Sequence, residues 1–312
     1  MGASAQQDTL KYRISLKDKA ATTYSLDHPE KFLSEKAIAR RQRQQLPVDS
    51  TDLPVCRRYV DAIRDKGVKI VAMGKWDNFV TVSCNDSAVI GEIAALPFVR
   101  ATEKVWVAPS KPAAEDKRDS LANSPLKSEN YYGPALRQIE ISNGEKLHEA
   151  GFKGQGMTIA VIDAGYHNVD KIEAMKNIRP VVLLHQMLGR FIFTAENVLT
   201  VGAIDRRGVL ASFSSIGNTA DNRVKPDVVA VGLNSDVMGT NGNLRKASGT
   251  SFASPILCGM VTCLWQACPQ LTAKEIIELV RQSGDRIDFP DNIYGYGVPD
   301  LWKAYQSVSK KK

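Results

Sequence analysis

A serine stands at the start of a long apolar stretch in the last third of this chain. The segment Gly249-Thr250-Ser251-Phe252-Ala253-Ser254-Pro255 leads into residues 252–268, which are almost wholly apolar or small. This stretch is too short and too often interrupted to span a membrane, so it predicts a buried helix. Ser251 would stand at the positive end of that helix, beside free backbone N–H groups. A nucleophile that stabilises an oxyanion needs this setting, although a serine before an apolar run can also be a plain N-cap.

The sequence also predicts the backbone conformation at Gly249 and the position of Pro255 in the helix. Gly249 is expected where the backbone approaches another segment closely or takes a positive φ. Pro255 is expected in the first turn of the helix, where a missing N–H has little consequence.

A second segment points to the same chemistry. Residues 154–165 read Gly-Gln-Gly-Met-Thr-Ile-Ala-Val-Ile-Asp-Ala-Gly, which predicts a glycine turn and a buried strand that ends at Asp163. The carboxyl end of such a strand is where an α/β sheet presents side chains to a crevice.

With both segments in view, the chain resembles the subtilisin-like serine peptidases (subtilases). Asp163 falls at the triad aspartate of the family's V-I-D-x-G motif, and Ser251 falls at the nucleophile of its G-T-S-x-A-x-P motif. Their order along the chain is also that of subtilisin. Tyr166 is a departure, because the family usually has an aliphatic residue there. The resemblance implies an α/β domain with a parallel sheet and helices on both faces, and peptide-bond hydrolysis by an Asp/His/Ser triad.

The histidine that this resemblance calls for is missing from its expected motif. In the family it lies between the Asp and the Ser, in an H-G-T-like motif. His28 and His148 precede Asp163, and His167 follows it by four residues, in a loop where the family often has a noncatalytic histidine. His185 is the other candidate, but Gln186 stands where glycine is expected. A surface or partly buried histidine without a chemical role is the alternative interpretation of His185.

The length between the two motifs gives an independent argument. Residues 196–203 resemble the family strand that follows the catalytic histidine and the oxyanion asparagine, so only residues 164–195 are left for what should lie between. A single βαβ unit needs about 30 residues, and the family builds several there. No Gly-Asn-x-Gly-like oxyanion motif precedes Asn197. The chain therefore resembles a subtilase whose central segment has been removed, with a junction at 180–193. A natural deletion, an engineered one and an error in reconstructing the gene all remain open.

Because the motifs of the catalytic histidine and of the oxyanion asparagine are both missing, we predict an inactive or nearly inactive chain. Without a general base, the Ser251 hydroxyl is a poor nucleophile at neutral pH. An oxyanion-hole donor contributes about 3–4 kcal/mol to catalysis, and the asparagine that would supply it is also absent.

Composition and periodicity divide the chain into four parts. Residues 1–7 contain Ala3-Ser4-Ala5, typical of the end of a signal peptide, so they are interpreted as its remnant or as a disordered cytosolic N-terminus. Residues 8–109 follow the order β-α-β-β-α-β with one extra helix, which predicts a small α+β ferredoxin-like domain. This domain resembles the propeptide that precedes the catalytic domain of many subtilases. Residues 110–130 are a linker, and residues 131–312 are the subtilisin-like domain without its centre.

Individual elements are predicted within these parts. The first domain has expected strands at 12–16, 68–72, 78–84 and 98–107, and helices at 29–45, 54–66 and 87–96. The second has an expected helix at 144–150, a buried strand at 227–231, a glycine- and asparagine-rich loop at 237–248, and a helix at 273–282 that opens with a Thr272/Glu275 capping box.

Charge and cysteines add little to the functional prediction. The net charge is +7, but the basic residues of the 29–45 helix and the terminal lysines lack interleaved aromatics, so nucleic-acid binding is not expected. Cys258, Cys263 and Cys268 share the serine helix at spacings that suit core residues better than metal ligands. Cys56 and Cys84 could pair in an oxidising compartment. No cofactor is expected, and the structural calcium that the resemblance allows has no assignable ligands.

Three functions stay open. The first is a secreted or periplasmic endopeptidase zymogen that cleaves protein or peptide substrates and carries its first domain as a tethered inhibitor. The second is a noncatalytic protein whose first domain binds and inhibits a separate subtilase. The third is a non-functional deletion fragment. The endopeptidase is favoured as the family function, and the deletion fragment is favoured for this particular molecule.

Overall fold

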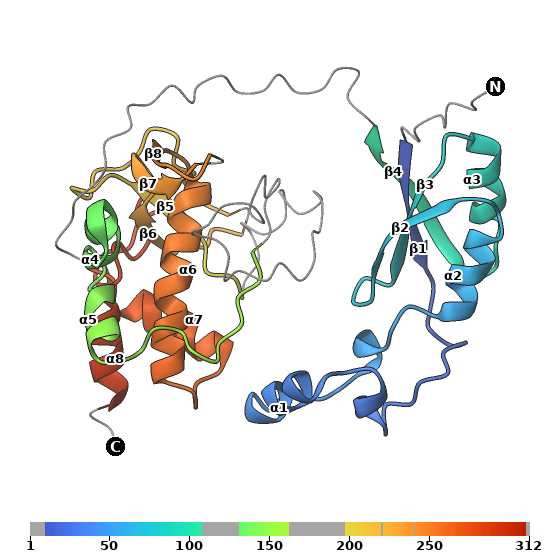
Figure 1. Cartoon of the computed structure of the whole chain (residues 1–312), viewed down its shortest axis with the longest axis horizontal. Helices are drawn as coiled ribbons and strands as arrows, with labels where there is room; N and C mark the ends of the chain where they lie inside the picture. Colours follow the sequence, from blue (N-terminus) through green and yellow to red (C-terminus); the bar gives the residue numbers. More distant parts are fainter. Residues whose placement is uncertain (1–9, 108–130, 162–196, 220, 240, 310–312) are drawn as a thin grey trace. The chain divides into compact units, whose positions relative to one another are not determined.

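The computed structural model describes residues 10–107, 131–161, 197–219, 221–239 and 241–309 (Figure 1). The chain forms two compact units, Met1–Arg118 and Asp119–Lys312, and each is described by itself below. Of the helices in these ranges, not one combines the length and the apolar character that crossing a membrane requires.

The first unit is built on a four-stranded antiparallel sheet. Its strands are β1 (Leu10–Leu16), β2 (Lys69–Gly74), β3 (Phe79–Ser83) and β4 (Val99–Val107). They lie in the order β2-β3-β1-β4, so that β1 is central although it comes first in the chain. Helix α2 (Arg57–Arg64) connects β1 to β2, and α3 (Ser87–Ala94) connects β3 to β4. This is the ferredoxin-like arrangement predicted from the order of elements.

The core of the first unit lies between the two helices and one face of the sheet. Ile14, Val80 and Val82 from the strands are fully buried against Ile63 and Ile93 from the helices. The side chains of β2 alternate between partly buried and exposed, and Val71 and Met73 are 44% and 55% exposed. One face of β2 is therefore open to solvent.

Between β1 and α2, residues 17–56 form an excursion of the chain that adds no strand to the sheet. The expected continuous helix at 29–45 forms instead as a 3₁₀ turn, η1 (Pro29–Lys31), and a separate helix, α1 (Glu35–Arg43), which is followed by η2 (Ser50–Asp52). Ser34 separates the two by capping α1, because its hydroxyl accepts a hydrogen bond from the N–H of Ala37 at 3.3 Å. The ammonium group of Lys19 holds the η2 turn in place by donating to the carbonyls of Ser50, Thr51 and Leu53 at 2.6–3.0 Å.

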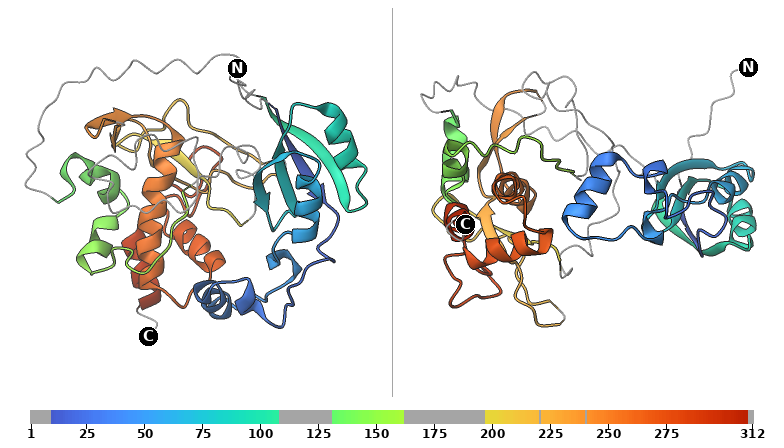
Figure 2. Two further views of the ribbon diagram at one scale, coloured as in Figure 1. Left: turned by 45° about the vertical axis from the view of Figure 1, so that its right-hand side comes forward. Right: turned by 90° about the horizontal axis from the view of Figure 1, so that it is seen from below.

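The second unit has two small sheets and a group of helices. Strands β5 (Val201–Ile204) and β6 (Val228–Val231) are parallel, and β7 (Ser235–Met238) and β8 (Leu244–Ala247) form an antiparallel hairpin. The helical elements are η3 (Gly133–Ala135), α4 (Leu136–Glu140), α5 (Gly144–Glu149), α6 (Thr250–Ala267), α7 (Ala273–Gln282) and α8 (Leu301–Ser309). Figure 2 shows the same elements from two further directions.

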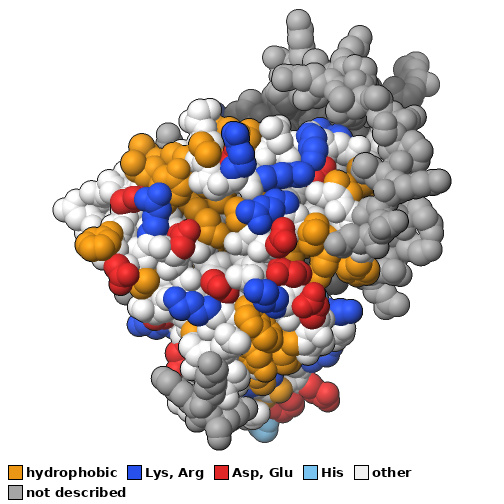
Figure 3. All heavy atoms as spheres, turned by 90° about the vertical axis from the view of Figure 1, so that its left-hand side faces the viewer, with side chains coloured by type: hydrophobic (Ala, Val, Ile, Leu, Met, Phe, Trp, Pro, Cys, Tyr) orange, Lys and Arg blue, Asp and Glu red, His pale blue; other side chains and the backbone are white. Residues whose placement is uncertain are grey.

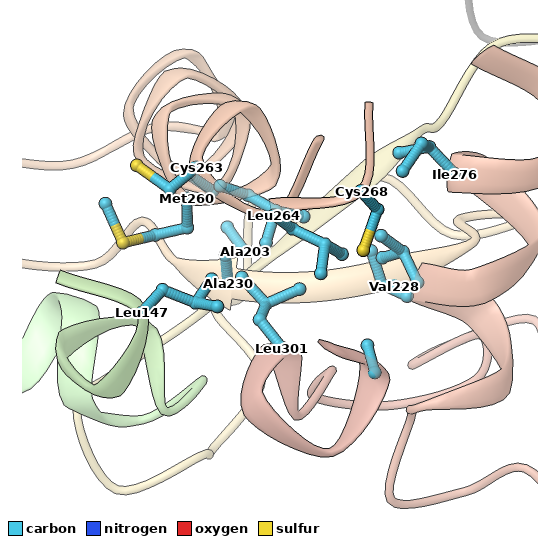
Figure 4. Packing of buried hydrophobic residues seen from close by; sticks show 14 of the residues in the cluster. Leu147, Ala203, Val228, Ala230, Met260, Cys263, Leu264, Cys268, Ile276 and Leu301 are labelled. Atoms are coloured by element: carbon cyan, nitrogen blue, oxygen red, sulfur yellow. The ribbon is translucent and has the colours of Figure 1, made fainter. Parts of the chain in front are cut away.

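The core of the second unit surrounds the two parallel strands. Figure 4 shows buried side chains of α5, α6 and α8 gathered around Ala203, Val228 and Ala230. All four residues of β6 are buried, as expected for a strand of a parallel sheet. This mixed helix and strand packing agrees with an incomplete α/β subtilisin-like domain.

The buried strand that was expected to end at Asp163 does not form in its described part, residues 157–161. Ile159 and Val161 are 46% and 56% exposed, and the segment belongs to no sheet of the described residues. On each edge of the β5–β6 pair, a backbone hydrogen bond already joins the strand to another segment. The N–H of Ala211 bonds to the carbonyl of Ala203 at 2.9 Å on one edge, and the N–H of Val229 bonds to the carbonyl of Gly297 at 3.1 Å on the other.

The predicted loop at 237–248 is also corrected. Most of it forms the β7–β8 hairpin, with Asp236 opposite Lys246 and Met238 opposite Leu244. Its glycines and asparagines sit in the turn, where Gly242 has a φ of +81°. Turn residues between two short strands produce the same composition as a loop, so composition alone did not separate the two.

The cysteines are only partly as predicted. Cys263 and Cys268 are buried in the core, but Cys258 is exposed and is not a core residue. Cys56 and Cys84 are buried free thiols, so the disulfide considered for them is not formed. Within the described ranges, no group of three or more His, Cys, Asp or Glu side chains is arranged to hold a metal ion.

Candidate active site

Helix α6 places Ser251 at its start, as the sequence predicts. The N-cap is Gly249, whose carbonyl accepts hydrogen bonds from the N–H groups of Phe252 and Ala253 at 3.1 and 3.4 Å. Ser251 is therefore inside the helix and does not serve as its cap. Its side chain is exposed, while the face of α6 that includes Ala253 and Leu257 is fully buried. The hydroxyl is thus presented to solvent at the positive end of a fixed helix.

Pro255 does not lie in the first turn, where it was expected. Because the helix already begins at Thr250, Pro255 falls in the second turn. A proline there cannot donate a hydrogen bond to the carbonyl of Ser251, four residues earlier. The helix accepts this defect because its buried face, and not its first hydrogen bonds, holds it in place.

Gly249 takes a positive φ, +159°, which is one of the two reasons for which a glycine was expected there. A Cβ at 249 would find room, since its nearest neighbour is the Phe252 ring at 3.6 Å, but the backbone conformation would strain any other residue. The close approach is made by Gly232, just after β6, where a Cβ would lie 2.8 Å from both the Gly249 carbonyl oxygen and the Ala203 Cβ. The N–H of Gly249 donates to the Gly232 carbonyl at 2.8 Å. The start of α6 is thereby fixed to the end of β6.

The other end of β6 is held by a buried carboxylate, Asp227. Its Oδ2 accepts from the ammonium of Lys225 at 2.6 Å and from the N–H and hydroxyl of Thr200 at 2.7 and 2.9 Å. Its Oδ1 accepts from the Arg281 guanidinium at 2.9 Å. Lys225 and Asp227 are each 1% exposed. Because these partners come from the start of β5, the start of β6 and α7, one carboxylate joins the three elements that support the serine helix.

The remaining catalytic candidates from the sequence fall outside the described residues. These are Asp163, paired with Ser251 as the expected triad, and the histidines His167 and His185. The structure therefore places Ser251 and leaves the assignment of Asp163 a prediction.

The two described histidines have other partners. In the first unit, Nδ1 of His28 lies 3.3 Å from Glu30 Oε1 at the surface. In the second unit, His148 on α5 lies between Tyr132 and Cys263, with Nδ1 2.8 Å from the Tyr132 hydroxyl and Nε2 3.5 Å from the Cys263 sulfur. Burial, with a smaller contribution from Lys153, lowers the pKa of His148, and burial raises the pKa of the Cys263 thiol. This cluster is therefore neutral at neutral pH.

His148 cannot act on Ser251. It contacts α6 at residue 263, and residues 251 and 263 are about 18 Å apart along a helix that rises about 1.5 Å per residue. A general base has to lie within hydrogen-bond reach of the proton that it removes. Among the described residues, the Ser251 hydroxyl accordingly has no hydrogen bond to a base.

Sequence reasoning missed Asp227, Lys225 and Gly232. A signal was present for the first two, because Lys225-Pro226-Asp227 comes immediately before the apolar run at 228–231, and charged residues beside a buried strand are unusual. Gly232 follows the same run, but a glycine after a strand is common, and only its three-dimensional neighbours identify its role.

Comparison with known proteins assigns a family to each unit. Residues 11–121 match the peptidase S8 propeptide domain of Bacteroidota, and residues 184–297 match the subtilase family. The second match includes Ser251 and the Asp227 cluster.

Individual relatives are matched over a limited part of their length. The chain is 35% identical over 126 residues to the serine protease AprX of Bacillus subtilis, which covers 33% of this chain and 28% of AprX. It is 34% identical over 126 residues to the membrane-bound transcription factor site-1 protease of Mus musculus, which covers 37% and 12%. The solved structure of the Clostridium perfringens CspB protease is 25% identical, with a TM-score of 0.35 and coverage of 39% and 29%. The chain thus spans less than a third of the length of each of these proteins.

Proposed function

The chain belongs to the subtilase family, and we propose that it is by family a subtilisin-like serine endopeptidase, with Ser251 as nucleophile and Asp163 as the triad carboxylate. We propose further that this particular chain is inactive or nearly so. The second proposal rests on the position of Ser251. It is exposed at the start of α6, while His148, on α5, contacts α6 only near its far end, at Cys263.

The mechanism behind this proposal follows from the geometry of α6. A peptide carbonyl that reaches Ser251 would meet the positive end of a long helix, which stabilises developing negative charge. The attacking hydroxyl must also lose its proton, and neutral serine loses it too rarely without an adjacent base. Loss of one triad member typically leaves only the catalysis that binding and the oxyanion hole supply.

Labelling by a fluorophosphonate tests this proposal directly, because the reagent reacts with activated serines. We expect no labelling of the folded chain, and none of Ser251→Ala or Asp163→Ala. Labelling that is lost in both Ser251→Ala and His185→Ala would overturn the proposal of inactivity and would identify His185 as the base. A circular dichroism spectrum of each variant confirms that it is folded.

A second function is favoured by the exposed face of strand β2 in the first unit. This unit matches the S8 propeptide domain, and Val71 and Met73 are exposed on β2. We propose, as the alternative, that the full chain binds and inhibits a separate, active subtilase through this face. The test is the rate of peptide cleavage by a purified subtilase as the chain is added. Inhibition that weakens in a Val71→Asp/Met73→Asp variant supports this function, and an unchanged cleavage rate contradicts it.

The remaining expectations follow from the family and belong to the same proposal. They are a protein or peptide substrate, a tethered inhibitory role for the first unit, and export to the periplasm or the medium. Cleavage of a substrate by this chain requires a working triad, so the labelling experiment comes before any test of substrates.

A further inference from the structure

Helix α1 has no place in the ferredoxin-like core of its unit. None of its residues is buried, whereas α2 and α3 each bury two. It is held mainly by Arg41, which forms an ion pair with the buried Asp52 and donates to the Pro47 carbonyl at 2.9 Å. Figures 1 and 2 show α1 standing away from the four-stranded sheet of the same unit. One side of this helix is therefore available to a partner.

Three cations line that exposed helix. Lys36, Arg40 and Arg43 are all exposed, and they recur at positions i, i+4 and i+7, which lie on one face. Within the described ranges, none of the three forms an ion pair. No acidic residue lies between positions 36 and 46. Glu35, in the first turn, is the one acidic residue of α1, so the helix carries a clear excess of positive charge.

This stripe of three cations does not serve the helix itself. Arg40 and Arg43 lie in the last turn, where the helix dipole favours cations, but Lys36 lies in the first turn, where it disfavours them, and like charges at i and i+4 destabilise a helix. A nine-residue helix is already marginal in water when it buries nothing. An anionic partner would remove the repulsion and stabilise the helix.

Exposed apolar side chains flank α1 at both ends. Before it, Tyr24 is 39% exposed and packs edge-on against Phe32, with ring centroids 5.8 Å apart. After it, Leu46 is 50% exposed, and its N–H bonds to the Arg41 carbonyl at 2.9 Å, which keeps it beside the last turn. Leu26 is 40% exposed in the same excursion. The segments on either side of the three cations thus carry an exposed tyrosine and two exposed leucines.

We propose that α1 and its flanking residues bind the surface of an anionic phospholipid bilayer. The three cations would lie among the lipid phosphates, and Tyr24 and Leu46 would enter the boundary between headgroups and acyl chains. A single-stranded nucleic acid is the less suitable occupant, because two of the three flanking side chains, Leu26 and Leu46, are aliphatic, and Tyr24 alone among them offers a base a ring for stacking. The face of the second unit drawn in Figure 3 is a contrast, since Lys and Arg side chains are interspersed there with Asp and Glu.

Vesicle flotation with the full chain tests the proposal. One set of vesicles contains only phosphatidylcholine, and in the other a third of the lipid is phosphatidylglycerol. We expect binding to the anionic vesicles alone, and weaker binding at high salt. The variant Lys36→Gln/Arg40→Gln/Arg43→Gln should bind about 100-fold more weakly, at the usual contribution of each cation near a membrane.

Two matched variants make the result specific. Arg58→Gln/Arg100→Gln/Lys104→Gln removes the same charge from exposed positions elsewhere in the unit and should bind nearly as the wild type does. Leu46→Ser should weaken binding to vesicles but leave binding to a single-stranded DNA unchanged.

Three outcomes would overturn the proposal. Equal losses in the two charge variants would mean that only net charge matters. Binding to neutral vesicles would show that the three cations are not required for membrane binding. Binding to single-stranded DNA that depends on the stripe, without vesicle binding, would assign the surface to nucleic acid. Thermal unfolding of each variant establishes that it is folded.

Discussion

The carbonyl of Gly232 and the N–H of Gly249 form a 2.8 Å hydrogen bond that joins the end of β6 to the start of the serine helix. The two backbones can come this close because Gly232 has no side chain. A Cβ there would lie 2.8 Å from the Gly249 oxygen and 3.0 Å from the Ala253 Cβ. The position of Ser251 therefore depends on a glycine that lies outside the serine motif.

Replacing Gly232 by alanine should destabilise the second unit by about 1–3 kcal/mol, the usual effect of overpacking a core. The free energy of unfolding in urea measures this. Gly259→Ala is the matched control, because a Cβ at 259 meets nothing within 4 Å and alanine favours a helix over glycine. Equal stability of the two variants would show that the contact between β6 and α6 is not tight.

Replacing Asp227 by asparagine should destabilise the same unit by about 3–5 kcal/mol, because Lys225 would remain buried without its counter-charge. Denaturant unfolding again gives the value. Asp221→Asn provides the control, since Asp221 pairs with Arg223 at the surface and should matter little. A loss at 227 no larger than at 221 would refute the role given to the buried carboxylate.

Replacing Lys19 by methionine should destabilise the first unit by about 1–2 kcal/mol. Methionine keeps the aliphatic stem but removes the ammonium group that binds the carbonyls of Ser50, Thr51 and Leu53. Thermal unfolding of the variant measures the loss, with Lys104→Met at an exposed position of β4 as control. If proteolysis of residues 45–56 is no faster in Lys19→Met, the ammonium does not hold the turn.

The stability of the second unit should fall as the pH is lowered through the ordinary pKa of histidine. Burial lowers the pKa of His148 in the folded protein, so the unfolded chain takes up a proton first as the pH decreases. The contribution of His148 to stability is complete above its pKa in the unfolded chain, about 6.5. It decreases below that pH and levels off beneath the pKa of His148 in the folded protein. Melting temperatures between about pH 8 and about pH 5 would display this profile. His148→Gln should lack it, and an identical profile in that variant would attribute the effect to other groups.

Much of the local structure was predictable because short-range chemistry decides it. The capping box of α7 formed as expected, with the Thr272 N–H donating to Glu275 Oε2 at 2.7 Å and the Glu275 N–H returning a bond to Thr272. The order of strands and helices in the first unit likewise follows from alternation and turn residues along the chain. The long apolar helix with Ser251 at its start is of the same kind.

The long helix with Ser251 near its start, the order of strands and helices in the first unit, and the family that the two motifs resemble could all be predicted from the sequence. The packed structure was needed to show that the expected 29–45 helix divides into η1 and α1, that residues 157–161 join no sheet of the described residues, that most of 237–248 forms a hairpin, and that Gly232 and Asp227 support the start of α6. Periodicity and caps act within a few residues. The edge of a strand, the room around a glycine and the partners of a buried carboxylate depend on segments that are distant in the chain, so they exist only once those segments are packed together.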